Sequence, residues 1–223
     1  MAKRIALIHA VTVAIDPVEQ AFRVLWPEAE RVNILDDSLS VDRAKTSELT
    51  PAIHDRIQRL ASYGRDIGAD GVLFTCSAFG SAIEAAAQAA TWPVLKPNEA
   101  MFEAALAAGQ TIGLLATFER SIPGMEAEFQ ELATSRGSKT RIKSIAVPQA
   151  MIALQNGDVA THNALLAEAV PRLGDCDAIM LAQFSTSRAA AAVQQRTKVP
   201  VLTSPGTAVA KMKRALTTNP LSR

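Results

Sequence analysis

A thiol stands where an apolar, strand-like run ends and a helix begins. The stretch GVLFTCSAFGSAIEAA (71–86) is apolar up to Phe74, continues as Thr75, Cys76 and Ser77, and then becomes alanine-rich. A thiol at a helix N-terminus meets unpaired N–H groups and the positive end of the helix dipole, which favour thiolate. The same N–H groups, with the Thr75 and Ser77 hydroxyls, can hold a carboxylate. We predict that this turn places Cys76 beside a substrate α-carbon for proton transfer or nucleophilic attack. The alternative is a buried cysteine that merely packs.

The other reactive residue types are sparse. Cys176 lies between two aspartates in the turn before a strand, and we assign it no role. His9 ends an apolar strand, where a histidine is more commonly a core residue, and is a candidate base by location alone. His54 and His162 lie among polar neighbours on helix faces and are expected at the surface. No cluster has metal-ligand spacing and no glycine-rich phosphate loop occurs, so we expect neither a metal nor a cofactor.

Three strand-like segments recur with a constant offset of 107 residues, taking position 5 to 112, 70 to 177 and 93 to 200. A shared register across half the chain is not a coincidence of apolar runs, and it predicts two halves of one topology that arose by duplication. The pairs are RIALIHAV and TIGLLATF, DGVLFTCS and DAIMLAQF, and WPVLKP and VPVLTS.

The alternation of short buried strands with amphipathic helices predicts an α/β fold. We expect two similar flavodoxin-like lobes, each a parallel sheet flanked by helices, with a cleft between them. The first lobe is predicted as 1–97 plus 206–223, and the second as 98–205. Ligands of such sheets bind outside the carboxyl ends of the strands, which are expected to face each other across the cleft.

Capping signals and periodicity predict where the helices begin and end. Asp16 is the expected cap of the first helix, with Pro17 in its first turn and Glu19 as capping-box partner. Thr50 is expected to cap the helix that begins at Pro51. Residues 33–49 and their counterpart 142–158 differ most between the halves; we expect the first to be a long loop and the pair to determine substrate choice. Further helices are expected near 78–90, 98–108, 122–135, 158–172, 186–196 and 206–217.

The composition excludes several classes of function. The chain has 223 residues, 48% of them hydrophobic, a net charge of +1 and 4% aromatic residues, so neither nucleic acid nor a membrane is an expected partner. The apolar N-terminus mimics a signal peptide, but its internal twin at 111–118 indicates a strand. Two cysteines form no disulfide framework, which favours a reduced cytoplasmic setting.

The segments VLFTCSAFGSAIEAA, IMLAQFSTSRAA and VPVLTSPGTAV resemble the aspartate/glutamate/hydantoin racemase superfamily, which also contains arylmalonate decarboxylase and maleate isomerase. The resemblance covers nearly the whole chain, and the cysteine turn is its most specific part. It implies a cofactor-independent, metal-free enzyme that acts on a small carboxylate and can form a homo-oligomer. In the racemases, one cysteine per lobe flanks the α-carbon, and the pair exchanges its proton from opposite faces.

Carried over to this chain, the resemblance assigns Cys76 to the first-lobe cysteine and leaves Gln183 at the second-lobe position. An amide is neither acid nor base near neutral pH, so symmetric two-thiol racemization is in doubt. We expect an enzyme that acts at the carbon next to a carboxylate of an amino acid, hydantoin or related acid. Three roles are open for Cys76: it pairs with a non-thiol base, it protonates an enediolate after decarboxylation, or it adds to an unsaturated diacid as in maleate isomerase. In arylmalonate decarboxylase the retained cysteine belongs to the other lobe. A catalytically silent carboxylate-binding protein is the remaining alternative.

Further polar residues are expected at the strand ends. Thr117 resembles family positions that hydrogen-bond a substrate carboxylate, although a strand-end threonine also bonds local backbone. Ser185 and Thr186 are either a second anion seat or plain helix caps. Gln183 is expected to donate an N–H to a developing oxyanion, with Thr12 a weaker candidate of the same kind. The predicted substrate-binding set is Thr12, Thr75, Ser77, Thr117, Phe118, Ser185 and Thr186.

Overall fold

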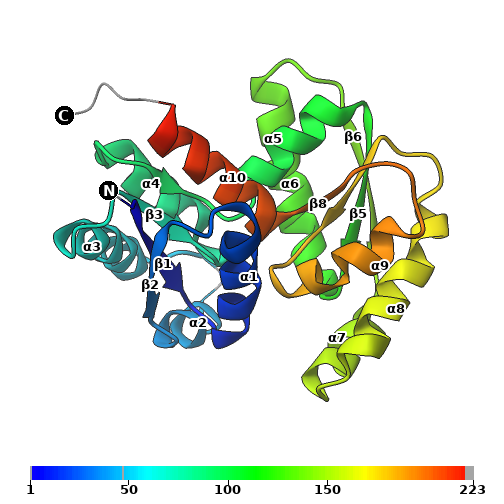
Figure 1. Ribbon diagram of the computed structural model, residues 1–223, viewed down its shortest axis with the longest axis horizontal. Coiled ribbons are helices and arrows are strands. Elements are labelled where there is room, and N and C mark those ends of the chain that lie inside the picture. Colours follow the sequence, from blue (N-terminus) through cyan, green and yellow to red (C-terminus); the bar gives the residue numbers. More distant parts are fainter. Residues whose placement is uncertain (1, 47, 219–223) are drawn as a thin grey trace. The chain divides into compact units, whose positions relative to one another are not determined.

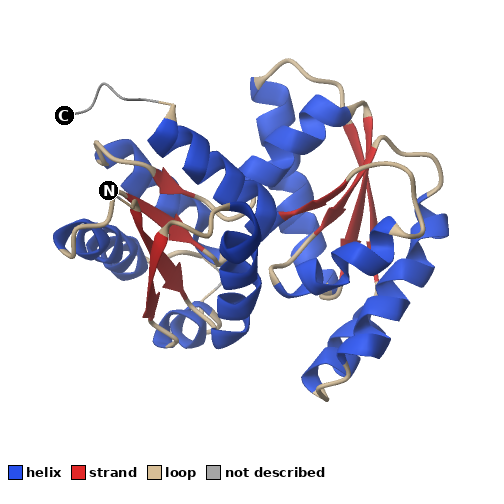
Figure 2. Ribbon diagram, viewed as in Figure 1, coloured by secondary structure: helices blue, strands red, loops and turns tan. Residues whose placement is uncertain are grey.

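The chain folds into two compact units, each built on a parallel sheet (Figures 1 and 2). The computed structural model describes residues 2–46 and 48–218. Unit 1 runs to Glu99 and resumes at Ala208, and unit 2 is Ala100–Thr207. Each unit has a four-stranded sheet with helices on both faces, so the predicted α/β class is confirmed.

Unit 1 contains four parallel strands in the order β2-β1-β3-β4. In its register, Leu7 lies opposite Asn33 on one side and Leu73 on the other, so β1 is central. The strands are β1 (Arg4–His9), β2 (Glu30–Leu35), β3 (Gly71–Phe74) and β4 (Val94–Leu95). The helices are η1 (Thr12–Ala14), α1 (Ile15–Leu25), α2 (Ser38–Arg43), α3 (Pro51–Asp66), η2 (Ser77–Phe79), α4 (Gly80–Ala89) and, from Ala208 onward, α10 (Ser204–Thr217).

Strand alternation assigns the side chains of unit 1 to two faces. Even-numbered positions of β1 and β3, such as Ile8 and Phe74, pack in one cluster with buried residues of α3 and α4. Odd-numbered positions point the other way, where a Cβ added at Gly71 would lie 2.6 Å from the Met212 sulfur of α10. Cys76 belongs to the α3/α4 side, because it packs against that cluster.

Unit 2 repeats the arrangement, with strand order β6-β5-β7-β8. One face of its sheet packs against α5 and α6, and the other packs against α8 and α9. Its strands are β5 (Thr111–Ala116), β6 (Arg141–Ala146), β7 (Ala178–Leu181) and β8 (Val201–Thr203). Its helices are α5 (Glu99–Ala108), η3 (Glu119–Ser121), α6 (Ile122–Ser135), α7 (Pro148–Gln155), α8 (Val159–Ala169), η4 (Val170–Leu173), η5 (Ser185–Ala189) and α9 (Ala190–Gln194).

The repeat extends to individual hydrogen bonds at the amino ends of the strands. The Asp70 carboxylate accepts the backbone N–H of Arg4 at 2.9 Å. The equivalent Asp177 carboxylate accepts the N–H of Thr111 at 2.9 Å and that of Gln110 at 2.7 Å. Each aspartate therefore satisfies a backbone donor at the start of the neighbouring central strand, which holds the two strands in register.

Two expectations about local structure are wrong and one is confirmed. Asp16 is not a cap, because η1 brings the helix start forward to Ile15 and Asp16 lies inside the first turn. Residues 33–49 are not a long loop, since they contain the end of β2 and the helix α2, and 142–158 likewise contains most of β6 and all of α7. Thr50 caps α3 as expected, accepting the N–H of Ile53 at 3.3 Å.

Candidate functional site

Cys76 lies at the carboxyl end of β3, in extended conformation, immediately before the three-residue helix η2. Its thiol is largely buried against the α3/α4 cluster. Burial raises the pKa of the Cys76 thiol above its ordinary 9.0, although a hydrogen bond from the Ala78 backbone opposes the shift. The prediction of a lowered pKa is wrong because the residue precedes one short 3-10 turn and α4 begins only at Gly80. The full dipole of an α-helix therefore does not act on the sulfur.

Two hydroxyls predicted beside Cys76 have different surroundings. Ser77 is exposed, and so is Thr12 at the carboxyl end of the neighbouring strand β1, where it opens η1. Thr75 is 4% exposed, and its hydroxyl bonds within the protein. Unit 1 thus offers Ser77 and Thr12 as accessible polar groups at the strand ends, whereas Thr75 is buried.

Arg43 also reaches the cysteine turn, although sequence reasoning did not single it out. Its Nε donates to the carbonyl oxygen of Ala78 at 3.3 Å, so α2 is tied to the backbone two residues after Cys76. No motif marks this arginine. The one sequence feature that could have drawn attention to Arg43 is its position within 33–49, the segment expected to determine substrate choice.

His9 is 0% exposed, and both of its ring nitrogens have partners. Nδ1 lies 2.9 Å from the Thr75 hydroxyl, and Nε2 lies 2.9 Å from Oδ1 of Asn33. Burial lowers the pKa of His9 below its ordinary 6.5, against opposing contributions from Asn33 and Glu19, so the ring is neutral at pH 7. This enclosure leaves no open nitrogen for a substrate proton, and His9 is a core histidine.

In unit 2 the position equivalent to Cys76 is Gln183, and its side chain bonds to the neighbouring strand end. Its Oε1 accepts the Thr117 N–H at 3.2 Å and the Thr117 hydroxyl at 3.3 Å. Its Nε2 donates to the Ser121 hydroxyl at 2.8 Å, which leaves the second N–H of the amide for another acceptor. Gln183 therefore joins the carboxyl ends of β5 and β7.

The other residues predicted in unit 2 divide into buried and exposed members. The buried Thr186 hydroxyl donates to the Gln183 carbonyl at 2.6 Å and accepts the Gln183 N–H at 3.1 Å, which is a local turn bond. Ser185 is buried beside it. Phe118 is 51% exposed, an unusual placement for a phenylalanine at a strand end. Thus Thr117 and Thr186 use their hydroxyls locally, and Phe118 presents an apolar ring to solvent.

His162 is buried in unit 2, although we expected it at the surface. It is 0% exposed because it faces inward on α8, and its Nδ1 lies 2.8 Å from Oδ1 of Asn163. Within residues 2–46 and 48–218, no group of three potential ligands could hold a metal ion. In the same ranges, no helix combines the length and apolar character needed to cross a bilayer.

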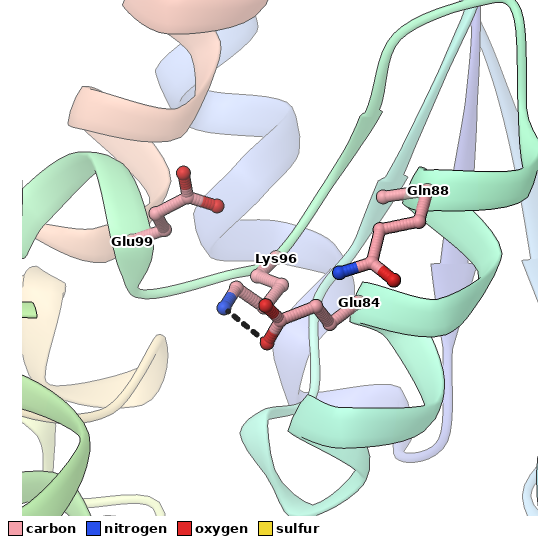
Figure 3. Close-up of a pocket in the computed structure, with 5 residues that line it drawn as sticks. Glu84, Gln88, Lys96 and Glu99 are labelled. Atoms are coloured by element: carbon pink, nitrogen blue, oxygen red, sulfur yellow. Dashed lines mark hydrogen bonds and ion pairs between the residues drawn. The ribbon is translucent and has the colours of Figure 1, made fainter. Parts of the chain in front are cut away.

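Two surface grooves of unit 1 contain none of the predicted site residues. The groove shown in Figure 3, of about 270 Å³, lies between α4 and the chain after β4, and Lys96 pairs with Glu84 across it at 3.2 Å. A second groove of about 550 Å³ lies between the end of α2 and the start of α3. The linings are Glu84, Ala87, Gln88, Lys96 and Glu99 in the first, and Asp42, Lys45, Thr46, Thr50, Ala52, Ile53, Arg56 and Arg59 in the second.

The Asp/Glu/Hydantoin racemase family model matches residues 12–212 of the chain. The chain belongs to this family. The match spans both units and includes the Cys76 and Gln183 turns. No curated protein sequence matches the chain.

Solved structures of two racemase-related proteins and a decarboxylase share the fold at low sequence identity. Allantoin racemase from Klebsiella pneumoniae superposes with a TM-score of 0.71 at 17% identity, covering 97% of this chain and 89% of that one. An aspartate racemase homologue from Pyrococcus horikoshii gives 0.73 at 13% identity, covering 97% and 100%. A glycine-to-cysteine mutant of arylmalonate decarboxylase gives 0.69 at 20% identity, covering 95% and 92%. At these identities the likeness establishes the fold alone.

Proposed function

We propose that this chain is a cofactor-independent enzyme that acts at the carbon next to a carboxylate of a small acid, with Cys76 as its proton donor. The observation that carries the proposal is the asymmetry between two equivalent turns. Unit 1 has a thiol at the carboxyl end of β3, whereas unit 2 has the Gln183 amide, held by Thr117 and Ser121. Since an amide cannot serve as a general acid or base near neutral pH, acid–base chemistry at these turns falls to Cys76.

The protonation state of Cys76 supports a donor rather than a nucleophile. Because burial raises its pKa above the ordinary 9.0, the resting group at pH 7 is the thiol. A thiol can deliver a proton to a carbanion at once, whereas nucleophilic addition requires thiolate. Addition to an unsaturated diacid, the maleate-isomerase type of reaction, is therefore the least favoured of the thiol mechanisms.

Decarboxylation with protonation fits a single protonated thiol. In a malonate-type acid, the bond between the α-carbon and one carboxylate breaks, CO₂ leaves, and the electron pair remains as an enediolate. The Cys76 S–H then protonates the α-carbon, and the resulting thiolate recovers a proton from water. No base is needed to create the carbanion, which accounts for an amide at position 183. The Ser77 and Thr12 hydroxyls, both exposed at the ends of adjacent strands, are proposed to bind the retained carboxylate.

Racemization is the second candidate, and family membership favours it. It requires a base to remove the α-proton before a thiol returns one. His9 is enclosed on both nitrogens, so this base would have to be Cys76 itself or another group of the chain. On that mechanism Cys76 would have to ionise first, against the effect of its burial.

Proton NMR in D₂O separates these reactions. The panel contains aryl- and alkylmalonates, amino acids, hydantoins and maleate, each with wild type, Cys76→Ser and the matched control Cys176→Ser. We expect a malonate to yield a mono-acid carrying one deuterium at the α-carbon, with loss of the product in Cys76→Ser and retention in Cys176→Ser. Loss of an α-proton signal with inversion would instead establish racemization. Full turnover in Cys76→Ser would overturn the role of the thiol, and no conversion in the panel would favour a carboxylate-binding protein.

A further inference from the structure

A chain of hydrogen bonds lies on the face of the unit 1 sheet opposite Cys76 and ends at the residue before it. The Glu19 carboxylate on α1 accepts Nδ2 of Asn33 on β2 at 2.9 Å. Oδ1 of Asn33 meets Nε2 of His9 at 2.9 Å, and Nδ1 of His9 meets the Thr75 hydroxyl at 2.9 Å. Four elements, α1, β2, β1 and the end of β3, are thereby linked through side chains.

The donors and acceptors of this chain determine the histidine tautomer. Because the carboxylate of Glu19 can only accept, the amide nitrogen of Asn33 faces it and the amide oxygen faces His9. Nε2 of His9 must then carry the hydrogen, and in the neutral ring Nδ1 is left as an acceptor. The Thr75 hydroxyl therefore donates to His9 rather than to the Ile8 carbonyl, which lies farther away at 3.2 Å.

Unit 2 provides an internal comparison. Glu126 on α6, 107 residues after Glu19, accepts the hydroxyl of Ser144 on β6 at 2.6 Å. Ser144 lies opposite Leu114, as Asn33 lies opposite Leu7. Unit 1 thus has a hydrogen bond between α1 and β2, and unit 2 has its counterpart between α6 and β6.

The part of this hydrogen-bond chain formed by His9 and Thr75 is present in unit 1 but has no equivalent in unit 2. The positions equivalent to His9 and Thr75 are Ala116 and Ala182, both buried among apolar side chains of α5 and α6. A fully buried imidazole costs solvation free energy that alanine avoids, and stability of the sheet does not require it, since unit 2 builds the same sheet without one. The polar bridge occurs where the following residue is a thiol and is absent where it is Gln183.

We propose that His9, oriented by Asn33 and Glu19, is a positioning residue that holds Thr75 and thereby fixes the Cys76 turn to the end of β1. His9 acts through the hydroxyl of Thr75, the residue that precedes Cys76. The Thr75 backbone N–H also donates to the Ile8 carbonyl at 3.0 Å, so both its backbone and its side chain hold it to β1. The charged residues at this hydrogen-bond chain are Glu19 on α1 and Arg31 on β2, whose side chains pair at 3.3 Å. The proposal rests on the proposed function for its catalytic meaning, whereas the structural step can be tested without turnover.

The test compares Thr75→Val, which keeps the β-branched shape and loses the hydroxyl, with Thr75→Ser, which keeps the hydroxyl. The readout is the rate of Cys76 alkylation by iodoacetamide between pH 7 and 10, followed by peptide mass spectrometry. We expect Thr75→Val to accelerate alkylation about 2- to 12-fold, the effect of losing one hydrogen bond, because a looser turn hydrates the thiol and lowers its pKa. Thr75→Ser should stay within about twofold of wild type. Equal rates in all three proteins would overturn the proposal.

A second measurement uses the unaltered protein, so it does not depend on the folding of a variant. Long-range ¹H–¹⁵N correlations of the imidazole at pH 7.5 should show His9 as the neutral Nε2–H tautomer. An Nδ1–H tautomer or an imidazolium would contradict the derived hydrogen-bond order. Failure of the proposed function is recognised separately, as turnover that persists in Cys76→Ser. The positioning role fails if Thr75→Val alkylates Cys76 at the wild-type rate although Cys76→Ser has lost activity.

Discussion

The ionisation of Cys76 gives the most direct prediction, and alkylation as a function of pH measures it. Iodoacetamide reacts with thiolate, so the rate follows the ionised fraction until it reaches a plateau above the pKa. A thiol with its ordinary pKa of 9.0 is about 1% thiolate at pH 7. Burial raises the pKa of Cys76, so its ionised fraction at pH 7 should be below that of the unfolded chain. We expect alkylation at pH 7 to be slower in the native protein than in denaturant, and the native plateau to lie above pH 9.

The two cysteines can be followed in one experiment, because peptide mass spectrometry gives each its own rate. Cys176 is a useful comparison, since burial first and then Asp177 and Asp175 raise its pKa as well. If Cys76 acts as the acid, kcat should stay level through neutral pH and fall as the thiol ionises. A Cys76 plateau below pH 8 would refute the reasoning, because it would show that the turn stabilises thiolate despite its burial.

Three further predictions concern stability. Gly109→Ala should destabilise the protein by about 1–3 kcal/mol in urea denaturation, because the new Cβ would lie 2.2 Å from Cγ of Asp177, whose carboxylate is held by two N–H groups. Gly124→Ala is the matched control: nothing lies within 4 Å of its added Cβ, and alanine favours the helix. Thr50→Ala should cost about 0.5–2 kcal/mol by removing the cap of α3, and thermal unfolding measures it; an unchanged midpoint would show that the cap is not used. His9 has a folded pKa below 6.5 because of burial, so the unfolded state binds its proton first as the pH falls. Its contribution to the free energy of unfolding should be complete above pH 6.5 and be lost as the pH falls through the folded pKa; His9→Asn should reduce that slope relative to wild type.

Much of the architecture could be predicted because hydrophobic pattern and repetition depend on local sequence. The strand containing Ile5 and its twin containing Ile112 were recognisable from their constant offset, and both are central strands. The helix starting at Pro51 followed from its cap, and α6 begins and ends where its periodicity indicates. These features need no knowledge of distant contacts.

Features that depend on distant contacts could not be predicted. The short helix η2 changes the dipole at Cys76, and the α3/α4 cluster desolvates its sulfur, so the expected thiolate is a buried thiol. The two partners of His9, Thr75 and Asn33, come from two other strands, and Glu19 on α1 holds Asn33 in turn; no spacing in the sequence brings these residues together. His162 was misjudged because polar neighbours in sequence do not show which face of α8 is covered.

The return of the chain to unit 1 at Ala208 has a consequence for synthesis on the ribosome. Strand β3 is made early, but at Gly71 its surface is covered by Met212, which emerges some 140 residues later. Unit 2 is continuous in sequence, so its fold requires no residue after Thr207. Unit 1, which carries the thiol, must wait for the last helix with part of its core uncovered. A chain that stops after Thr207 should therefore contain all of unit 2, and unit 1 should be the part that chaperones and proteases recognise.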